Sequence, residues 1–401
     1  MRRPVYDRSL GFKSINALAG AKRRLALKKN SKTPRPRKSA AQITSTPLLP
    51  RTVGLDLGDQ TTHYCVLDEQ GNVVSEGTVR TTEVGFREQF RSMARARIVL
   101  ETGTHSPWVS RYLERLGHEV LVANARQVRI IYDNDRKTDK VDARTLARLA
   151  RVDKSLLHPI RHRSAEAQAD LAVLRARDQL VSVRTTLINC VRGLVKSVGG
   201  RLPSASGAYF ATKVREQVPA CISGALLPLL EEIENLTVRI REYDKRIEEL
   251  AKTKYSKTEL MRQIPGVGMV TSLAFALTLD DPNRFHKSRD VGSYFGLRPK
   301  QSDSGSSKPQ LSISKAGDHL VRRLLVNCAQ YVLGHWGPDC DLRRWGLSLM
   351  AHGGKNAKKR AVVAVARKLA VLMHKLWVRG EVYEPMRQAS KVTQTQAAPA
   401  A

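Results

Sequence analysis

The stretch Thr52-Val-Gly-Leu-Asp-Leu-Gly58 decides the fold of the first half of this chain. It is a short apolar run of the kind that forms a buried strand, interrupted by one acid, Asp56. Similar runs follow, separated by turns such as Asp68-Glu-Gln-Gly71. The expected strands cover 52–57, 62–67, 72–79, 97–101 and 119–123, and the expected helices cover 84–95, 108–116 and 138–152. This order of strands and helices predicts an α/β domain of the ribonuclease-H type over residues 51–155.

The chain is strongly basic, with 69 Lys and Arg against 37 Asp and Glu and a formal net charge of +32. Such an excess favours a polyanionic partner. Residues 1–50 contain 13 of the basic residues, one acid and few large apolar side chains, so we expect a disordered basic arm there. Residues 387–401, rich in Gln, Ala and Thr, are expected to form a disordered tail. The region between them is basic as well, which favours DNA as the partner.

Several classes of protein are excluded by composition. A membrane span needs about 18 consecutive apolar residues, and the best candidate, 361–377, contains three basic residues. The five cysteines are scattered, without a CxxC pair and without a secretory signal before them. This usage argues against disulfides and predicts a cytoplasmic protein without a membrane partner. None of the ten histidines has metal-ligand spacing, so no zinc site is expected.

The middle of the chain, residues 160–258, is expected to be helical. Apolar residues recur every seven positions from Leu174 to Val195 and again, more strongly, from Leu226 to Leu250. A strict seven-residue period is typical of a coiled coil or of a long antiparallel helical hairpin. We expect a coiled coil that joins subunits into a dimer or tetramer. The second series is Leu226, Leu229, Ile233, Leu236, Ile240, Tyr243, Ile247 and Leu250.

Four acids of the first domain have positions that favour a shared metal ion. Asp56 lies within a strand, and Glu101 ends a strand that we expect to be its neighbour. Asp139 and Asp142 are three residues apart, so both project from one face of a helix. Four carboxylates suit Mg²⁺, which prefers oxygen ligands. The alternative for each acid is a role in a turn or at a helix start.

Several segments together resemble a known family. Residues 53–58, 99–103 and 137–143 are similar to the DEDD motifs of insertion-sequence transposases whose catalytic domain is like the resolvase RuvC, the insertion-sequence-110 family. Further segments resemble successive motifs of that family's mostly helical transposase domain, here residues 259–386. These segments are 264–268, 294–299, 304–305, 313–318 and 363–370. The resemblance covers about residues 52–385 in the right order.

The resemblance implies an enzyme that cleaves and rejoins DNA strands. It implies that Asp56, Glu101, Asp139 and Asp142 hold Mg²⁺ and are catalytic. It further implies that Ser304 attacks DNA and forms a covalent phosphoserine link. A composite site shared between subunits, and a structured noncoding guide RNA that directs the protein to donor and target DNA, are also implied. The residues themselves indicate the RNA step only through their abundant positive charge.

The serine loop and its surroundings leave alternatives open. Ser302 and Ser306 are rival nucleophiles, and a flexible polar loop is the plain interpretation of a stretch with four serines. The turn containing Gly266 and Gly268 either contacts phosphate through backbone amides or only connects two helices. The basic helix around 355–376 is expected to face nucleic acid. Other cations expected to contact nucleic acid are Arg298, Lys300, Lys308 and Lys315.

Two other functions are compatible with the residues. In a Mg²⁺-dependent DNA nuclease or Holliday-junction resolvase, the acids hydrolyse DNA and the serine loop only binds it. In a non-enzymatic DNA-architectural protein, the basic surface binds DNA without catalysis. Covalent capture of DNA distinguishes the first from the transposase, and insensitivity to Asp56→Asn indicates the second.

Overall fold

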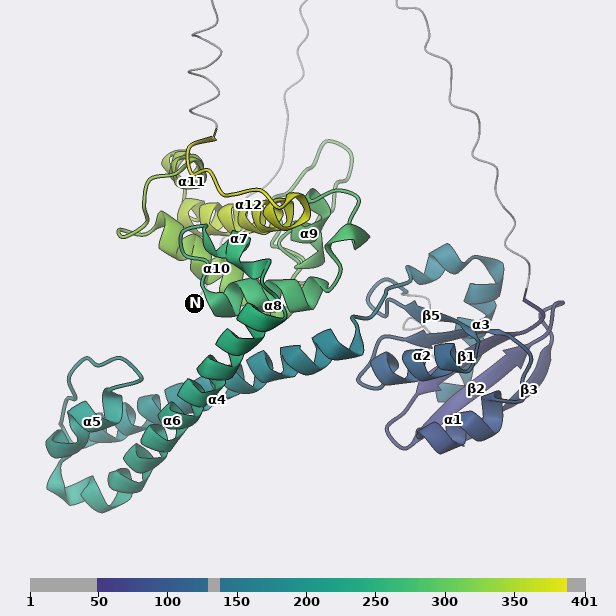
Figure 1. Cartoon of the computed structure of the whole chain (residues 1–401), viewed down its shortest axis with the longest axis horizontal. Coiled ribbons are helices and arrows are strands. Elements are labelled where there is room, and N and C mark those ends of the chain that lie inside the picture. The colour runs from purple at the N-terminus through teal and green to yellow at the C-terminus, as the bar shows by residue number, and fades with distance from the viewer. Residues whose placement is uncertain (1–48, 129–137, 388–401) are drawn as a thin grey trace, which may run out of the picture. The chain divides into compact units, whose positions relative to one another are not determined.

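The computed structural model describes residues 49–128 and 138–387 (Figure 1). Nearly all of the expected basic arm and of the expected tail lies outside the described residues, as does Lys137 at the start of the third DEDD-like segment. No helix in the described ranges is long and apolar enough to cross a membrane.

The first part of the described chain is an α/β domain built on a five-stranded sheet. The strands are β1 (Thr52–Leu57), β2 (Thr61–Leu67), β3 (Val73–Arg80), β4 (Arg97–Glu101) and β5 (Glu119–Ala123). Their order in the sheet is β3-β2-β1-β4-β5, with β1, β2 and β3 antiparallel and β1, β4 and β5 parallel. The α/β domain and the strands predicted from the sequence are therefore confirmed, and β1 lies at the centre of the sheet.

Helices pack on both faces of this sheet. They are α1 (Glu83–Phe90), α2 (Ser106–Arg115) and α3 (Asp139–Val152). Val53 and Leu55 of β1 belong to one core with residues of α1 and α2. Side chains alternate along a strand, so Gly54 and Asp56 face the other side, where α3 packs. The alternation places the acid of β1 on the face covered by α3.

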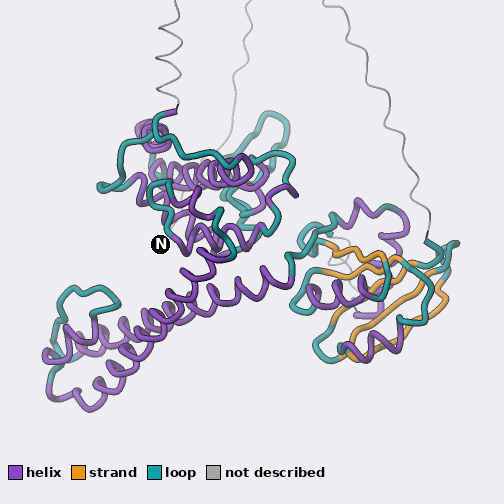
Figure 2. Tube along the Cα trace, viewed as in Figure 1, coloured by secondary structure: helices purple, strands orange, loops and turns teal. Residues whose placement is uncertain are grey.

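A long helical hairpin follows the sheet domain (Figure 2). Its helices are α4 (Ala165–Ser197) and α6 (Ser223–Thr253), with the short helix α5 (Phe210–Val214) between them. Arg177 bonds Asp244 at 2.6 Å, and Arg184, further along α4, bonds Thr237, earlier on α6, so the helices are antiparallel. The five most deeply buried members of the seven-residue series lie at this contact: Leu226, Ile233, Leu236, Ile240 and Ile247.

The hairpin decides between the two interpretations of the seven-residue period. The apolar face of α6 that we expected to join subunits is covered by α4 of the same chain. A regular apolar period specifies that a helical partner exists, but not whether another chain supplies it. Oligomerisation therefore stays a prediction, and it needs a different surface.

The remaining helices form an all-helical region with its own core. They are α7 (Thr258–Arg262), α8 (Met269–Leu279), α9 (Arg289–Tyr294), α10 (His319–Leu333), α11 (Asp341–Ala351) and α12 (Ala357–Arg379). Helix α8 is buried on all sides, as expected for a hydrophobic helix at the centre of a bundle. The first turns of α4 and the last turns of α6 add Leu171, Leu174, Ile247 and Ala251 to this core. The helical remainder predicted from the sequence is confirmed.

Candidate functional site

The structure brings the four predicted acids together around Asp56. This carboxylate is half-buried on β1, and its pKa is raised to about 6, mainly by burial and then by the charges of Asp139, Asp142 and Glu101, in that order of effect. His63, its cross-strand partner on β2, acts in the opposite direction. A carboxylate responds in this way to other carboxylates only at short range. The four acids therefore share one electrostatic environment.

Each acid is placed by a different part of the fold. Glu101 is the last residue of β4, which runs parallel to β1. Asp139 and Asp142 lie in the first turn of α3, whose N-cap Thr138 accepts a hydrogen bond from the backbone N–H of Val141. Asp142 is only 7% exposed, whereas the side chain of Asp139 is 70% exposed, with Oδ2 3.7 Å from Nε2 of His63.

The side chains do not stand at the distances of a preformed metal cage. Within residues 49–128 and 138–387, no group of three or more His, Cys, Asp or Glu side chains is close enough to hold an ion as oriented. The other three carboxylates act electrostatically on Asp56. The four side chains do not converge on one position where an ion could bind. Like charges repel at this range, so convergence on one point requires rotation of the side chains and a compensating positive charge.

Two contacts that the sequence analysis missed fix α3 against the sheet. A Cβ atom on Gly54 would lie 1.9 Å from the carbonyl oxygen of Ala143, so only glycine allows this helix to approach β1 so closely. Glu76 on β3 accepts two hydrogen bonds from Arg144, at 2.8 and 2.9 Å, and pairs with Lys140 at 3.0 Å. A glycine inside a strand is a known signal of close backbone approach, so the sequence could have indicated the contact at Gly54. No sequence pattern around Glu76 indicates its pairing with α3.

The raised pKa of Asp56 makes a prediction about stability. Because its folded-state pKa of about 6 exceeds the ordinary 3.8, its contribution to stability is fully present below about pH 4 and is lost as pH rises through 6. In EDTA, Asp56→Asn should therefore stabilise the protein at pH 8 and change little at pH 4. The pKa difference corresponds to at most about 3 kcal/mol, and solvent screening reduces this value. Urea unfolding at both pH values measures the difference, and equal effects at both would contradict it.

The serine stretch forms an exposed hairpin between α9 and α10. Pro299 pairs with Ile313 at its base, and Ser304 pairs with Ser307 at its tip, with N–H to O distances of 3.1 and 3.0 Å. Gly305 has a φ of +55°, which suits the first central position of a two-residue hairpin turn. Ser304 and its two rivals are all exposed, so the choice among the three serines stays open.

The weaker nucleic-acid candidates divide into two kinds. Gly266 has a φ of +82°, and a Cβ there would lie 2.7 Å from Cδ1 of Tyr331, so packing and turn geometry account for this glycine. Gly268 caps α8 and has open space around it. The candidate cations are placed on the serine hairpin or at its base, and all four are exposed: Arg298, Lys300, Lys308 and Lys315.

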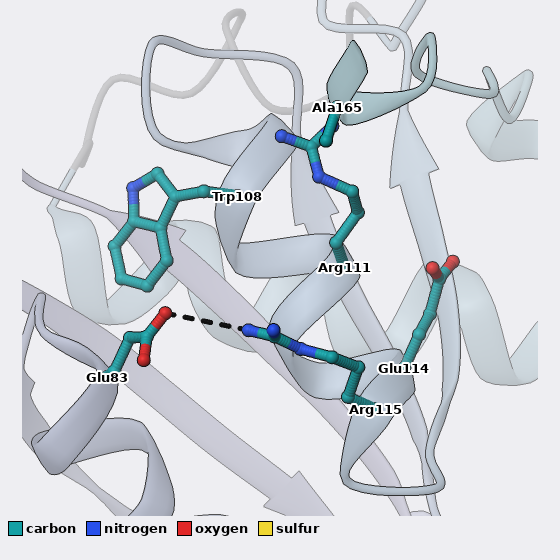
Figure 3. A pocket seen from close by; sticks show the side chains of 6 residues that line it. All are labelled: Glu83, Trp108, Arg111, Glu114, Arg115 and Ala165. Carbon is teal, nitrogen blue, oxygen red and sulfur yellow. Dashed lines mark ion pairs between the residues drawn. The ribbon is translucent and has the colours of Figure 1, made fainter.

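A separate pocket of about 500 Å³ lies beside helices α1 and α2 (Figure 3). Glu83 and Arg115 pair across it at 3.5 Å. Opposite charges within its own walls satisfy one another, and none of the four acids lines it. This pocket is therefore distinct from the candidate site. Its lining residues are Glu83, Trp108, Arg111, Glu114, Arg115 and Ala165.

Comparison with known proteins relates both halves of this arrangement to one family. A model of the DEDD transposase of IS110 elements matches residues 53–199, which include all four acids. A model described as the transposase of the IS116/IS110/IS902 family matches residues 258–343, which include the serine hairpin. The chain belongs to the IS110 family of transposases. Transposases cleave and join DNA, so this IS110-family protein is an enzyme acting on DNA.

Several curated transposases are similar to this chain over most of their length. The transposase for insertion sequence element IS1111A of Coxiella burnetii is 29% identical over 346 residues, which cover 83% of this chain and 91% of the relative. A probable family 20 transposase of Pseudomonas aeruginosa is 28% identical, covering 83% and 98%. The transposase for IS1328 of Yersinia enterocolitica is 26% identical, covering 69% and 82%. The IS110-family similarity thus extends across both halves of the chain.

Proposed function

We propose that this IS110-family transposase cleaves and rejoins DNA with a RuvC-like domain that binds Mg²⁺ and a serine nucleophile supplied by the helical region. One observation carries the proposal: on the central strand of the sheet, burial and then the charges of the three other acids raise the pKa of Asp56. Strand-borne and helix-borne carboxylates that converge in this way are a common support for phosphoryl transfer. The IS110-family match over residues 53–199 supports the same assignment.

The donor set fits a hard divalent cation. All four candidate ligands are carboxylates, which Mg²⁺ prefers over nitrogen and sulfur ligands. Their mutual repulsion, seen in the raised pKa of Asp56, is relieved by a cation. Asp56, Glu101, Asp139 and Asp142 would hold the ion, and bound Mg²⁺ supplies positive charge that polarises a scissile phosphate. The half-buried Asp56 is ionised above about pH 6, which suits this role at neutral pH.

The proposed covalent step takes place at Ser304. Its Oγ attacks the phosphorus of a DNA phosphodiester, a serine–phosphate bond forms, and the bond to the leaving sugar oxygen breaks while the serine proton passes to solvent. A DNA hydroxyl then attacks the phosphoserine and releases Ser304. One ester is exchanged for another at each step, so no external energy source is required. The exposed position of Ser304 at the tip of the hairpin supports access to DNA.

A second surface of the hairpin helices supports an oligomer, dimer or tetramer, with a composite site. Helix α4 carries an additional apolar stripe at alternating three- and four-residue spacing, and part of this stripe is exposed. Val183 and Leu194 in it are 39% and 43% exposed. Such spacing is typical of helices that pair, and this stripe is independent of the series on α6. The stripe consists of Leu180, Val183, Leu187, Cys190 and Leu194.

Guidance by a structured noncoding RNA is the part of the proposal that depends most on family resemblance. The net charge of +32 supports binding of RNA together with DNA, because each phosphate contact needs a cation. Sequencing of the RNA that co-purifies with the protein tests this part. Recovery of one discrete RNA supports it, whereas a random population of cellular RNA contradicts it.

Covalent capture tests the proposed function. We expect wild-type protein incubated with Mg²⁺ and radiolabelled donor DNA to yield a denaturation-resistant protein–DNA adduct. Ser304→Ala should reduce the adduct at least about 100-fold, because no other group replaces the attacking oxygen. Ser302→Ala and Ser306→Ala are matched controls from the same exposed hairpin and should retain it. If a control variant loses the adduct instead, the serine replaced in that variant is the nucleophile.

The same experiment addresses the nuclease or resolvase alternative. If the acids alone hydrolyse DNA, no adduct forms with wild-type protein, and Ser304→Ala continues to cut DNA in Mg²⁺. Such a result would contradict the serine mechanism, but it would still be consistent with a metal site at the four acids. The DNA-architectural alternative is disfavoured by membership of a transposase family.

A further inference from the structure

A basic pocket of about 520 Å³ opens between α9, α11, α12 and the base of the serine hairpin. Four cationic side chains and one carboxylate, Asp290, line it, together with Trp345. Its volume lies in the range of pockets that enclose a small ligand. The cations are Arg289, Arg298, Arg367 and Lys368.

Positive charge exceeds negative charge around this basic pocket, where Asp290 lines the wall and Asp341 acts on Lys368. Among the described residues, none of its four cations is within salt-bridge distance of a carboxylate. Lys368 instead stands over the ring of Trp345, with Nζ 4.1 Å from the ring centroid, and burial lowers the pKa of this lysine. Concentrating unpaired cations in a concave site costs electrostatic energy that an anionic ligand recovers.

The walls of the basic pocket are held firmly. A Cβ on Gly292 would lie 2.6 Å from Cγ of Arg367, so the stem of this arginine packs closely against α9. The backbone carbonyl of Arg298 accepts a hydrogen bond of 2.9 Å from the N–H of Ser314, which fixes the base of the hairpin. Helices α9 and α12 both contribute to the main helical core. Helices therefore present Arg289, Arg367 and Lys368, whereas the base of the hairpin presents Arg298.

We propose that the basic pocket binds one unpaired nucleotide of a nucleic-acid strand, with its phosphate on the arginines and its base against Trp345. Guanidinium groups bind phosphate through paired hydrogen bonds, and aromatic side chains stack with unpaired bases of any sequence. An acidic peptide would use the cations but not the aromatic ring. The proposal rests on the proposed function only in taking nucleic acid as the substrate.

The position of Arg298 connects the basic pocket with the chemistry. Arg298 lies six positions before Ser304, so the two lie within about 20 Å along the chain. A strand fixed at the base of the hairpin would be held beside the tip that carries the serine. The pocket thus positions the strand, and the hairpin reaches the scissile phosphate.

Binding and cross-linking without cleavage test the proposal. Full-length protein in EDTA is titrated with a fluorescein-labelled 20-nucleotide single-stranded DNA, with RNA of the same sequence and with the DNA duplex. Arg298→Gln combined with Arg367→Gln removes two charges of the pocket. Lys245→Gln combined with Arg246→Gln is the matched control, because it removes two charges from exposed positions on helix α6, away from the pocket. A strand containing 4-thiothymidine is cross-linked in parallel, and the attachment site is mapped by mass spectrometry.

We expect the pocket variant to bind single strands at least about 10-fold more weakly, with a smaller salt dependence, and the control variant to lose less than about 3-fold. Cross-links should map to the peptide containing Trp345 and disappear in Trp345→Leu. A preference for DNA or for RNA identifies which strand occupies the pocket. Equal losses in both variants, cross-links elsewhere, or stronger dependence on the pocket for duplex DNA would overturn the proposal. Adduct formation at Ser304 is measured separately. Failure of the pocket proposal can therefore be distinguished from failure of the proposed function.

Discussion

Asp56→Asn is expected to slow Mg²⁺-dependent strand cleavage by about 10³-fold or more, equivalent to about 4 kcal/mol of transition-state stabilisation. The amide keeps the shape of the side chain but removes the charge at the centre of the four acids. Because Asn cannot neutralise a divalent cation, the affinity for Mg²⁺ should fall as well. Cleavage of labelled donor DNA at several Mg²⁺ concentrations measures both effects.

Asp59→Asn is the matched control for this substitution. Asp59 lies three residues further along the chain, with a side chain that is 93% exposed and paired with His105 at 3.1 Å. It does not appear among the charges that act on Asp56. Its substitution should leave cleavage within about 3-fold of wild type, as for most surface changes. Equal losses for both variants, or full activity of Asp56→Asn, would refute the assignment of the metal site.

Gly54→Ala is expected to lower both the stability of the sheet domain and its activity. The new methyl group would lie 1.9 Å from the carbonyl oxygen of Ala143 and 2.7 Å from the amide nitrogen of Ala147, both backbone atoms of α3. Helix α3 must move away from β1, which should cost about 1–3 kcal/mol or more. Since α3 carries Asp139 and Asp142, cleavage should fall even at temperatures where the variant is folded.

Gly103→Ala is the control for Gly54→Ala. Gly103 follows Glu101 by two residues, as Gly54 precedes Asp56 by two, but a Cβ there meets no atom within 4 Å. Thermal unfolding and cleavage per folded molecule should be close to wild type for this control. An unchanged unfolding temperature in Gly54→Ala would show that the close approach of α3 and β1 is unimportant. Reduced stability with normal cleavage would show that the close contact stabilises the domain but is not needed to place Asp139 and Asp142.

Much of the fold was predictable because its signals are local. Short apolar runs with turns between them marked all five strands to within one or two residues, and α3 was expected one residue before its observed start. The seven-residue period marked α6, but it left open which helix covers the apolar face. The covering helix is α4 of the same chain, since the connection through α5 lets α6 return alongside α4.

The candidate site was predictable in part. The positions of Asp56 and Glu101 in their strands and of the acid pair on α3 are visible in the sequence, and the structure places all four within electrostatic range. The serine stretch was expected as a nucleophile loop, but its hairpin form depends on pairs such as Pro299 with Ile313. The basic pocket was not predicted, because its cations come from three separate elements.

The sequence by itself determined the elements, their order, the excess of positive charge and the identity of the four acids. Periodicity and charge are properties of neighbouring residues, so the sequence displays them directly. Only the tertiary structure decided that α3 lies against β1, through Gly54 and through the pairing of Glu76 with Arg144. These contacts join residues 68 or more positions apart. Local patterns carry no information about such pairs, because folding brings them together through packing of complete elements.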